Sequence, residues 1–155
     1  MSHSGGCQCG AVRYRAERIE DFSICHCRMC QKAFGNFGAP LVIAHGVTWT
    51  RGTPSEFRSS SIVARGFCAA CGTPLYMREN DEPYEIAVFS LDHPDMAGAP
   101  LRQSGVESRA PWIASLAALP SEETTDYRTP EDMRRLRSRQ HPDHDTDRWP
   151  PEDEP

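Results

Sequence analysis

Seven cysteines in three closely spaced groups are the residues of this chain best suited to chemistry. The groups are Cys7-x-Cys9, Cys25-x-Cys27-x-x-Cys30 and Cys68-x-x-Cys71. Cysteine thiolates at such spacings are typical zinc ligands. An odd number of cysteines cannot pair off completely as disulfides within one chain. We therefore expect metal ligands in a reducing compartment rather than a disulfide framework.

The first and third groups together supply enough ligands for a closed structural zinc site. The third group lies in GFCAACGTPLY (66–76), where C-x-x-C followed by Gly72 is typical of zinc-ribbon turns. Two more ligands are needed, and Cys7 and Cys9 are the obvious donors because glycines flank them. Such a site would contribute roughly 10 kcal/mol to folding. With only 38% hydrophobic residues, the chain has a modest core for that zinc to supplement.

The second group leaves Cys25, Cys27 and Cys30 as a set of three. Three protein ligands and an open fourth position are the pattern of a catalytic zinc. Three thiolates give the ion a net negative charge, which suits the exchange of sulfur ligands better than the activation of water. A thiol bound there would be held as thiolate, the form that attacks a carbonyl carbon.

Two other interpretations of the triplet remain open. The cysteines could form a second structural site completed by a histidine, the candidates being His26, His45 and His93. They could also form a redox switch in which Cys27 and Cys30 close a disulfide after metal loss. In an extended C-x-C segment, however, the residue between the two ligands points away from the metal. We therefore expect His26 to face solvent or to contact a ligand residue, and not to bind the metal itself.

Other side chains near the triplet are candidates for substrate contacts. Arg28 and Lys32 are the nearest cations in sequence and could bind a carboxylate of a glutathione-like thiol, or could be ordinary surface charges. Phe34, Phe37 and Trp49 could line a pocket or simply belong to the core.

Short β-type segments dominate residues 10–92 and must position these groups. They are rich in β-branched and aromatic residues and are separated by Gly, Pro and Asn/Asp turns; they span 11–17, 39–44, 47–52, 56–67 and 84–91. The pattern predicts small antiparallel sheets rather than βαβ units. Short helices are expected near Cys30 and after Pro111, where Trp112 should anchor the turn against the sheet.

The chain divides by composition into a body (1–120) and a tail (121–155). The body has 11 acidic and 11 basic side chains, whereas the tail accounts for the whole net charge of −5 and holds five of the 13 prolines. We expect little packed structure in the tail beyond one exposed helix within 130–140.

The neutral body and acidic tail argue against nucleic acid as a partner. No apolar run is long enough to span a bilayer, and MSHSGGCQCG has no features of a secretion signal. We therefore expect a cytoplasmic protein that does not engage membranes. Small sheet proteins often pair through exposed edges, so a homodimer is also possible.

Four segments together resemble the glutathione-dependent formaldehyde-activating enzyme family, which includes the centromere protein V domain. They are GGCQCGAVRY (5–14), ICHCRMCQKAFG (24–35), GFCAACGTPLY (66–76) and ESRAPW (107–112). The order of the three cysteine groups is far more specific than any single C-x-x-C. The resemblance covers roughly residues 5–120 and leaves the tail outside.

The resemblance implies an all-β, zinc-ribbon-like β-tent with one structural and one catalytic zinc. By position, the structural ligands are Cys7, Cys9, Cys68 and Cys71, and the catalytic ligands are Cys25, Cys27 and Cys30. It also implies a carbon–sulfur lyase activity, the reversible addition of glutathione to formaldehyde. Members commonly carry a histidine shortly before the motif matching ESRAPW, where this chain has Gln103 and Ser104.

A second class of function remains compatible with the sequence. The chain could be a non-catalytic zinc module whose sheet surface or tail binds another protein. Metal counting separates the two classes, because an enzyme should hold one zinc that responds to chelators or thiols and a module should hold only inert zinc.

Overall fold

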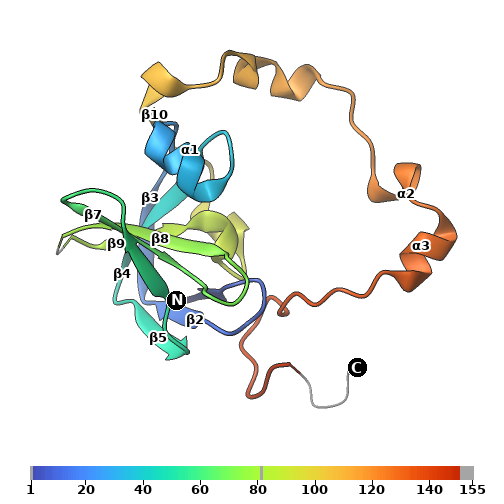
Figure 1. Cartoon of the computed structure of the whole chain (residues 1–155), viewed down its shortest axis with the longest axis horizontal. Helices are drawn as coiled ribbons and strands as arrows, with labels where there is room; N and C mark the ends of the chain where they lie inside the picture. The colour runs from blue at the N-terminus through green and yellow to red at the C-terminus, as the bar shows by residue number, and fades with distance from the viewer. Residues whose placement is uncertain (1, 81, 151–155) are drawn as a thin grey trace.

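The computed structural model describes residues 2–80 and 82–150, and most of its regular structure is β-sheet. Ten strands form two sheets in this part of the chain (Figure 1). The strands are β1 (His3–Gly6), β2 (Arg13–Ala16), β3 (Arg18–Cys25), β4 (Ala39–His45), β5 (Thr48–Arg51), β6 (Ser55–Arg58), β7 (Val63–Phe67), β8 (Pro74–Glu79), β9 (Tyr84–Ala87) and β10 (Arg102–Ser104).

The larger sheet has the strand order β10-β3-β4-β9-β8-β7-β6, and the smaller has the order β1-β2-β5. All pairings are antiparallel except that of β10, which runs parallel to β3. The predicted fold class, mainly β with short helices, is confirmed. The parallel pair was not predicted, because the three residues of β10 are too few to show a sequence period.

The main core lies between the two sheets. Tyr14 and Ile86 have no exposed surface, and Trp49 packs against Tyr14 and Tyr76 with ring centroids 5.7 Å apart in both pairs. Trp49 is therefore a core residue rather than part of a pocket wall. Phe34 packs on a separate small cluster of Cys30, Ala39 and Leu41, and it also lines a cleft of about 400 Å³.

A short helix, α1 (Arg28–Phe34), follows β3 and carries part of the second cysteine group. Cys27 has extended backbone angles (φ −60°, ψ 150°), and its sulfur accepts a hydrogen bond from the N–H of Cys30 at 3.4 Å. This sulfur therefore caps the helix N-terminus as a serine oxygen would. Gly35 ends the helix in the left-handed conformation (φ 58°). The helix predicted near Cys30 is confirmed.

Six short helices follow β9 in the part of the chain that the structure describes. They are the 3₁₀ helices η1 (Val88–Ser90), η2 (Pro94–Ala97), η3 (Val106–Ser108) and η4 (Pro111–Ala118), then α2 (Thr124–Tyr127) and α3 (Pro130–Arg135). The helices predicted after Pro111 and within 130–140 correspond to η4 and α3. No helix in the described part of the chain is both long and apolar enough to cross a bilayer.

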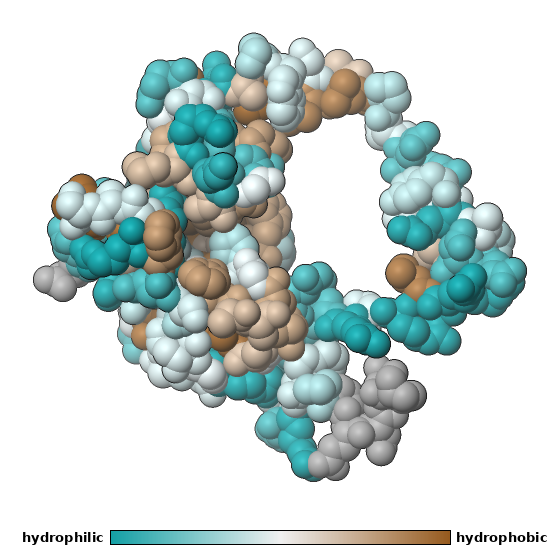
Figure 2. Space-filling view, viewed as in Figure 1, coloured by the Kyte–Doolittle hydropathy of each residue, from teal (hydrophilic) through white to brown (hydrophobic). Residues whose placement is uncertain are grey.

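From η4 onward the chain leaves the body as a wide arc (Figure 1). Residues 114–140 are all exposed, and the space-filling view shows open space between the arc and the body (Figure 2). Trp112 does not anchor the chain against the sheet as predicted. Its side chain is 53% exposed and packs edge-on against Phe37, with ring centroids 6.1 Å apart. The apolar residues of η4 therefore contribute little to the core.

Residues 141–149 return to the body and pack on the smaller sheet. The N–H of His141 donates to the carbonyl oxygen of Gln8 at 2.7 Å, and His141 is only 4% exposed. The carboxylate of Asp145 accepts hydrogen bonds from Arg13 at 2.8 Å and from Arg15 at 2.5 Å. The composition of the tail did not indicate this packing, because single polar side chains rather than an apolar pattern hold the segment in place.

Candidate functional site

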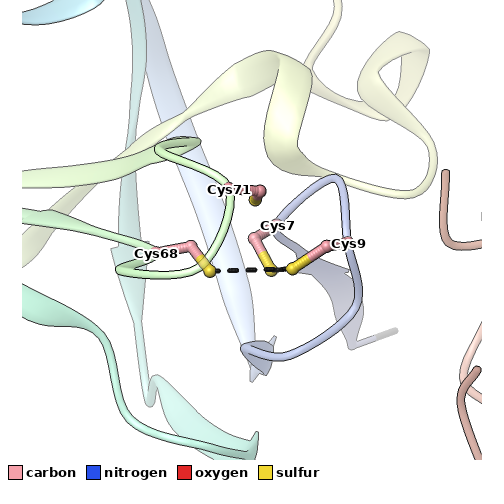
Figure 3. A group of neighbouring side chains, drawn as sticks. All are labelled: Cys7, Cys9, Cys68 and Cys71. Carbon is pink, nitrogen blue, oxygen red and sulfur yellow. Dashed lines mark hydrogen bonds between the residues drawn. The ribbon is translucent and has the colours of Figure 1, made fainter. Parts of the chain in front are cut away.

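The four cysteines of the first and third groups converge from two loops. Cys7 and Cys9 lie between β1 and β2, and Cys68 and Cys71 lie between β7 and β8 (Figure 3). The four sulfur atoms all lie within 4.8 Å of one another. The sulfur of Cys9 is 3.6 Å from that of Cys7 and 3.8 Å from that of Cys68. The fold thus brings together the four residues predicted to hold a structural metal.

Backbone hydrogen bonds shape both loops. The N–H of Gly72 donates to the carbonyl oxygen of Cys68 at 2.8 Å, and Gly72 has φ +76°, which only glycine adopts without strain. In the other loop, the N–H of Val12 donates to the sulfur of Cys7 at 3.2 Å. Such N–H···S bonds favour the thiolate form that a metal requires.

The spacing of these sulfurs fits a zinc ion. Tetrahedral zinc with Zn–S bonds of about 2.3 Å places neighbouring sulfurs about 3.8 Å apart, close to the distances observed. Burial raises the pKa of the Cys7 thiol to about 12. At Cys71 burial also acts upward, but the hydroxyl and N–H of Thr73 outweigh it and lower the pKa to about 6. Metal binding at neutral pH would therefore release a proton from Cys7.

The three cysteines of the second group also come together. Cys25 ends β3, Cys27 caps α1 and Cys30 lies in the first turn of that helix. Their sulfur atoms lie within 4.8 Å of one another, and no other histidine, cysteine, aspartate or glutamate of residues 2–80 and 82–150 joins the group. The donor set fits an ion with three protein ligands and one open position. The role of these cysteines as ligands stays a prediction.

The histidines considered as a fourth ligand have other partners or positions. His26 is 1% exposed, and its Nε2 lies 2.9 Å from Oε1 of Gln103. Nε2 of His45 lies 2.8 Å from a carboxylate oxygen of Glu20. His93 lines a separate cleft beside η2. The expectation that His26 does not itself bind the metal agrees with this geometry, although its ring is buried rather than facing solvent.

Strand β10 and the glycine that follows it form a wall beside the triplet. Ser104 pairs with Cys25 in the sheet register, and its carbonyl oxygen accepts from the N–H of His26 at 2.8 Å. Gly105 has φ +61°, and a Cβ added there would lie 2.6 Å from the backbone nitrogen of Cys27. The segment after η2 is therefore packed tightly against the candidate metal ligands.

Arg65 on β7 contacts the triplet, although the sequence patterns did not single it out. Its Nη2 donates to the sulfur of Cys30 at 3.5 Å, and its Nε donates to the hydroxyl of Ser59 at 3.0 Å. Burial raises the pKa of the Cys30 thiol to about 12, and the positive charge of Arg65 opposes that rise. A contact that joins residues 35 positions apart leaves no local signal in the sequence.

Arg28 and Lys32 lie close to this centre. Both side chains are exposed on α1, and both line a cleft of about 530 Å³ to which Arg65 also contributes. Nη1 of Arg28 donates to Oε1 of Gln31 at 2.6 Å. The two cations predicted to bind substrate therefore share a cleft with the guanidinium that contacts Cys30.

The chain is similar to a family of known proteins over the region that holds both cysteine groups. The profile of the family described as glutathione-dependent formaldehyde-activating enzyme matches residues 2–101, which include both cysteine centres. A protein of Halomonas elongata, whose curated name provisionally calls it a glutathione-dependent formaldehyde-activating enzyme, is 28% identical over 126 residues. That alignment covers 73% of this chain and 80% of the relative. The chain belongs to the glutathione-dependent formaldehyde-activating enzyme family.

Proposed function

We propose that this protein catalyses the reversible addition of a low-molecular-weight thiol such as glutathione to formaldehyde or another small aldehyde. With glutathione and formaldehyde the product is S-hydroxymethylglutathione, and the reverse reaction is that of a carbon–sulfur lyase. Family membership and the name of the Halomonas elongata relative support the substrates. The compartment we propose is the cytoplasm, where seven free thiols would stay reduced.

The contrast between the two cysteine groups is the observation that carries this proposal. The sulfurs of the first group are as many as a tetrahedral site needs (Cys7, Cys9, Cys68 and Cys71), whereas Cys25, Cys27 and Cys30 stand without a fourth ligand from the described residues. We assign a structural zinc to the first group and an exchangeable zinc to the second. When bound to the triplet, zinc would lower the pKa of a substrate thiol so that its sulfur is nucleophilic near neutral pH.

The reaction itself needs no oxidant or reductant. The thiol loses its proton to solvent, its sulfur forms a bond to the carbonyl carbon, and the C=O π electrons move to the oxygen. That oxygen takes a proton from water and becomes the hydroxyl of the adduct. The reverse reaction breaks the same C–S bond and returns thiol and aldehyde.

The side chains around the triplet would bind and orient the thiol substrate. Arg28 and Lys32 stand at the exposed edge of the cleft, where either can pair with a carboxylate of glutathione. On another side, Gly105 packs against Cys27 and limits access to the triplet. Substrate would therefore approach from the α1 side, along the cleft that the cations line.

Exchange NMR with ¹³C-formaldehyde and glutathione tests the proposal. The zinc-loaded wild type should accelerate exchange between free formaldehyde and the adduct at least tenfold over buffer, or about 1.4 kcal/mol in the barrier. Cys27→Ser should abolish the acceleration while leaving the four-cysteine site loaded. An acceleration that survives this change would contradict the proposal. No acceleration by the wild type would favour the alternative, a zinc module that binds another protein.

A further inference from the structure

We infer that Arg65 binds a carboxylate of the thiol substrate, in a groove between α1 and strands β6 and β7. The identity of the ligand rests on the proposed function. Arg65 would hold that ligand independently of the thiol sulfur. Neither the sequence patterns nor the family description assigns a role to this residue.

The groove consists of two adjoining clefts. One has a volume of about 530 Å³ and the other of about 400 Å³, and they share Ala33, Phe57 and Arg65 as lining residues. Arg65 therefore lies where the two clefts meet. An extended tripeptide could occupy both clefts with its middle beside this guanidinium.

Arg65 is held in place but incompletely paired. The residue is 7% exposed, and two of its nitrogen atoms are engaged, Nε by Ser59 and Nη2 by Cys30. Its Nη1 is buried and has no hydrogen-bond partner in the described part of the chain. Buried polar groups are almost always paired in folded proteins, so an unpaired guanidinium nitrogen indicates a missing acceptor. A carboxylate is the acceptor that matches a guanidinium best.

The charge of the groove favours an anionic ligand. Arg28, Lys32 and Arg65 line it, and none of the residues that line either cleft is acidic. Glutathione carries two carboxylates at neutral pH, so it can engage Arg65 and an exposed cation at the same time. A thiol without a carboxylate, such as cysteamine, lacks this anchor and should bind weakly.

The groove also presents apolar surface beside the cations. Phe57 is 63% exposed and Met29 is 49% exposed, and both line the cleft beside α1. Apolar side chains beside a small number of polar groups are typical of the lining of a binding groove. The methylene groups of a γ-glutamyl peptide would cover them.

The test uses S-methylglutathione, which keeps both carboxylates but has no free thiol to bind a metal. Its affinity for the zinc-loaded full chain is measured by calorimetry, with zinc content recorded for each variant. Arg65→Met should weaken binding at least tenfold, or about 1.4 kcal/mol. The matched control is Arg78→Met. Arg78 lies next to Met77 on β8, and Met77 is the register partner of Arg65, so Arg78 belongs to the other face of the sheet and should change affinity less than about twofold.

A second variant covers the case in which Arg65→Met fails to fold or to hold zinc. Arg65→Lys keeps the charge beside Cys30 but removes the free Nη1 donor. In the wild type, the diethyl ester of S-methylglutathione should bind at least tenfold more weakly than the acid. In Arg65→Lys that ratio should fall several-fold, because the two changes remove the same interaction. An equal ratio in both proteins would overturn the inference, as would wild-type affinity in a folded Arg65→Met.

These outcomes are separable from those of the proposed function. A chain that binds S-methylglutathione through Arg65 but does not accelerate the formaldehyde reaction keeps the inference and loses the function. A chain that accelerates the reaction, with binding of S-methylglutathione insensitive to Arg65, keeps the function and loses the inference.

Discussion

The indole Nε1 of Trp149 donates a hydrogen bond of 2.9 Å to the carbonyl oxygen of Cys9, 140 residues earlier in the chain. The ring of His141 packs edge-on against the same indole, with centroids 5.1 Å apart. A Cβ on Gly10 would lie 2.4 Å from the His141 ring and 2.5 Å from the Trp149 ring. His141 and Trp149 therefore cover the loop that carries the first pair of predicted zinc ligands.

Trp149→Ala should therefore loosen the four-cysteine site. Loss of the hydrogen bond and the ring contact should lower the free energy of unfolding by about 1–2 kcal/mol. Zinc transfer from this site to a chromogenic chelator should become several-fold faster. Trp112→Ala is the control, since Trp112 is exposed on the arc and contacts only the Phe37 ring among aromatic side chains of the described chain. Equal release rates in the two variants would contradict a protective role for the tail.

The ion pairs beneath the tail should differ in strength. Arg13 donates to Asp92 at 2.7 and 2.6 Å, and its side chain and that of Asp92 are each 4% exposed. Asp92→Asn should cost about 3 kcal/mol, because it leaves a buried guanidinium without its main counter-charge. The side chain of Asp145 is 38% exposed, so Asp145→Asn should lower the free energy of unfolding by only about 1 kcal/mol. Urea unfolding at pH 7 with zinc present measures both, and equal costs would be inconsistent with this ranking.

The sequence was most informative where ligand chemistry and local pattern coincide. The spacing of cysteines and glycines predicted that the first and third cysteine groups meet and that the second forms a separate set of three. This was possible because such turns are short and specify their own geometry. Alternating β-branched residues predicted a mainly β body.

The missed features depend on contacts between distant residues. Arg65 meets Cys30 only because the fold brings β7 next to α1, and one arginine in a strand leaves no pattern. The docking of residues 141–149 depends on a few polar side chains such as Asp145 in a tail whose composition indicates disorder. The prediction that Trp112 packs against the sheet was wrong, because apolar periodicity does not reveal whether another apolar surface lies within reach of the side chain.

A methyl group at Gly105 should disturb the triplet selectively. Gly105→Ala would place a Cβ 2.6 Å from the backbone nitrogen of Cys27 and 2.9 Å from its Cβ. Zinc at the triplet should then be lost first, so that brief chelation lowers the content from two per chain towards one. Gly98→Ala is the matched control, because Gly98 also has a positive φ (+70°) but no atom within 4 Å of the added Cβ. Because Gly98 combines φ +70° with ψ −155°, a region nearly restricted to glycine, the substitution should cost roughly 1–3 kcal/mol of stability but leave both zincs in place. Identical zinc retention in the two variants would argue against this packing.

Replacement of the buried carboxylate of Glu85 should raise the stability of the protein in a pH-dependent way. Burial raises its pKa, and the charge of Glu79 acts in the same direction. A folded pKa above the unfolded value means that ionised Glu85 costs stability at neutral pH, and that the cost vanishes as the pH falls below the ordinary value of about 4.3. Glu85→Gln should therefore be more stable than the wild type at pH 7, with an advantage that shrinks as the pH is lowered. Urea unfolding across a pH series measures the difference, and a less stable variant at pH 7 would refute this reading.

The assignment of one structural and one exchangeable zinc is tested most directly by the zinc content of the wild type and of Cys27→Ser. The content is determined by elemental analysis before and after incubation with glutathione and a mild chelator. We expect two zincs per wild-type chain, one of which becomes labile when glutathione is added, and a single inert zinc in Cys27→Ser. A Cys27→Ser protein that retains two zincs would contradict the assignment, because the ion assigned to Cys25, Cys27 and Cys30 would then not depend on those residues.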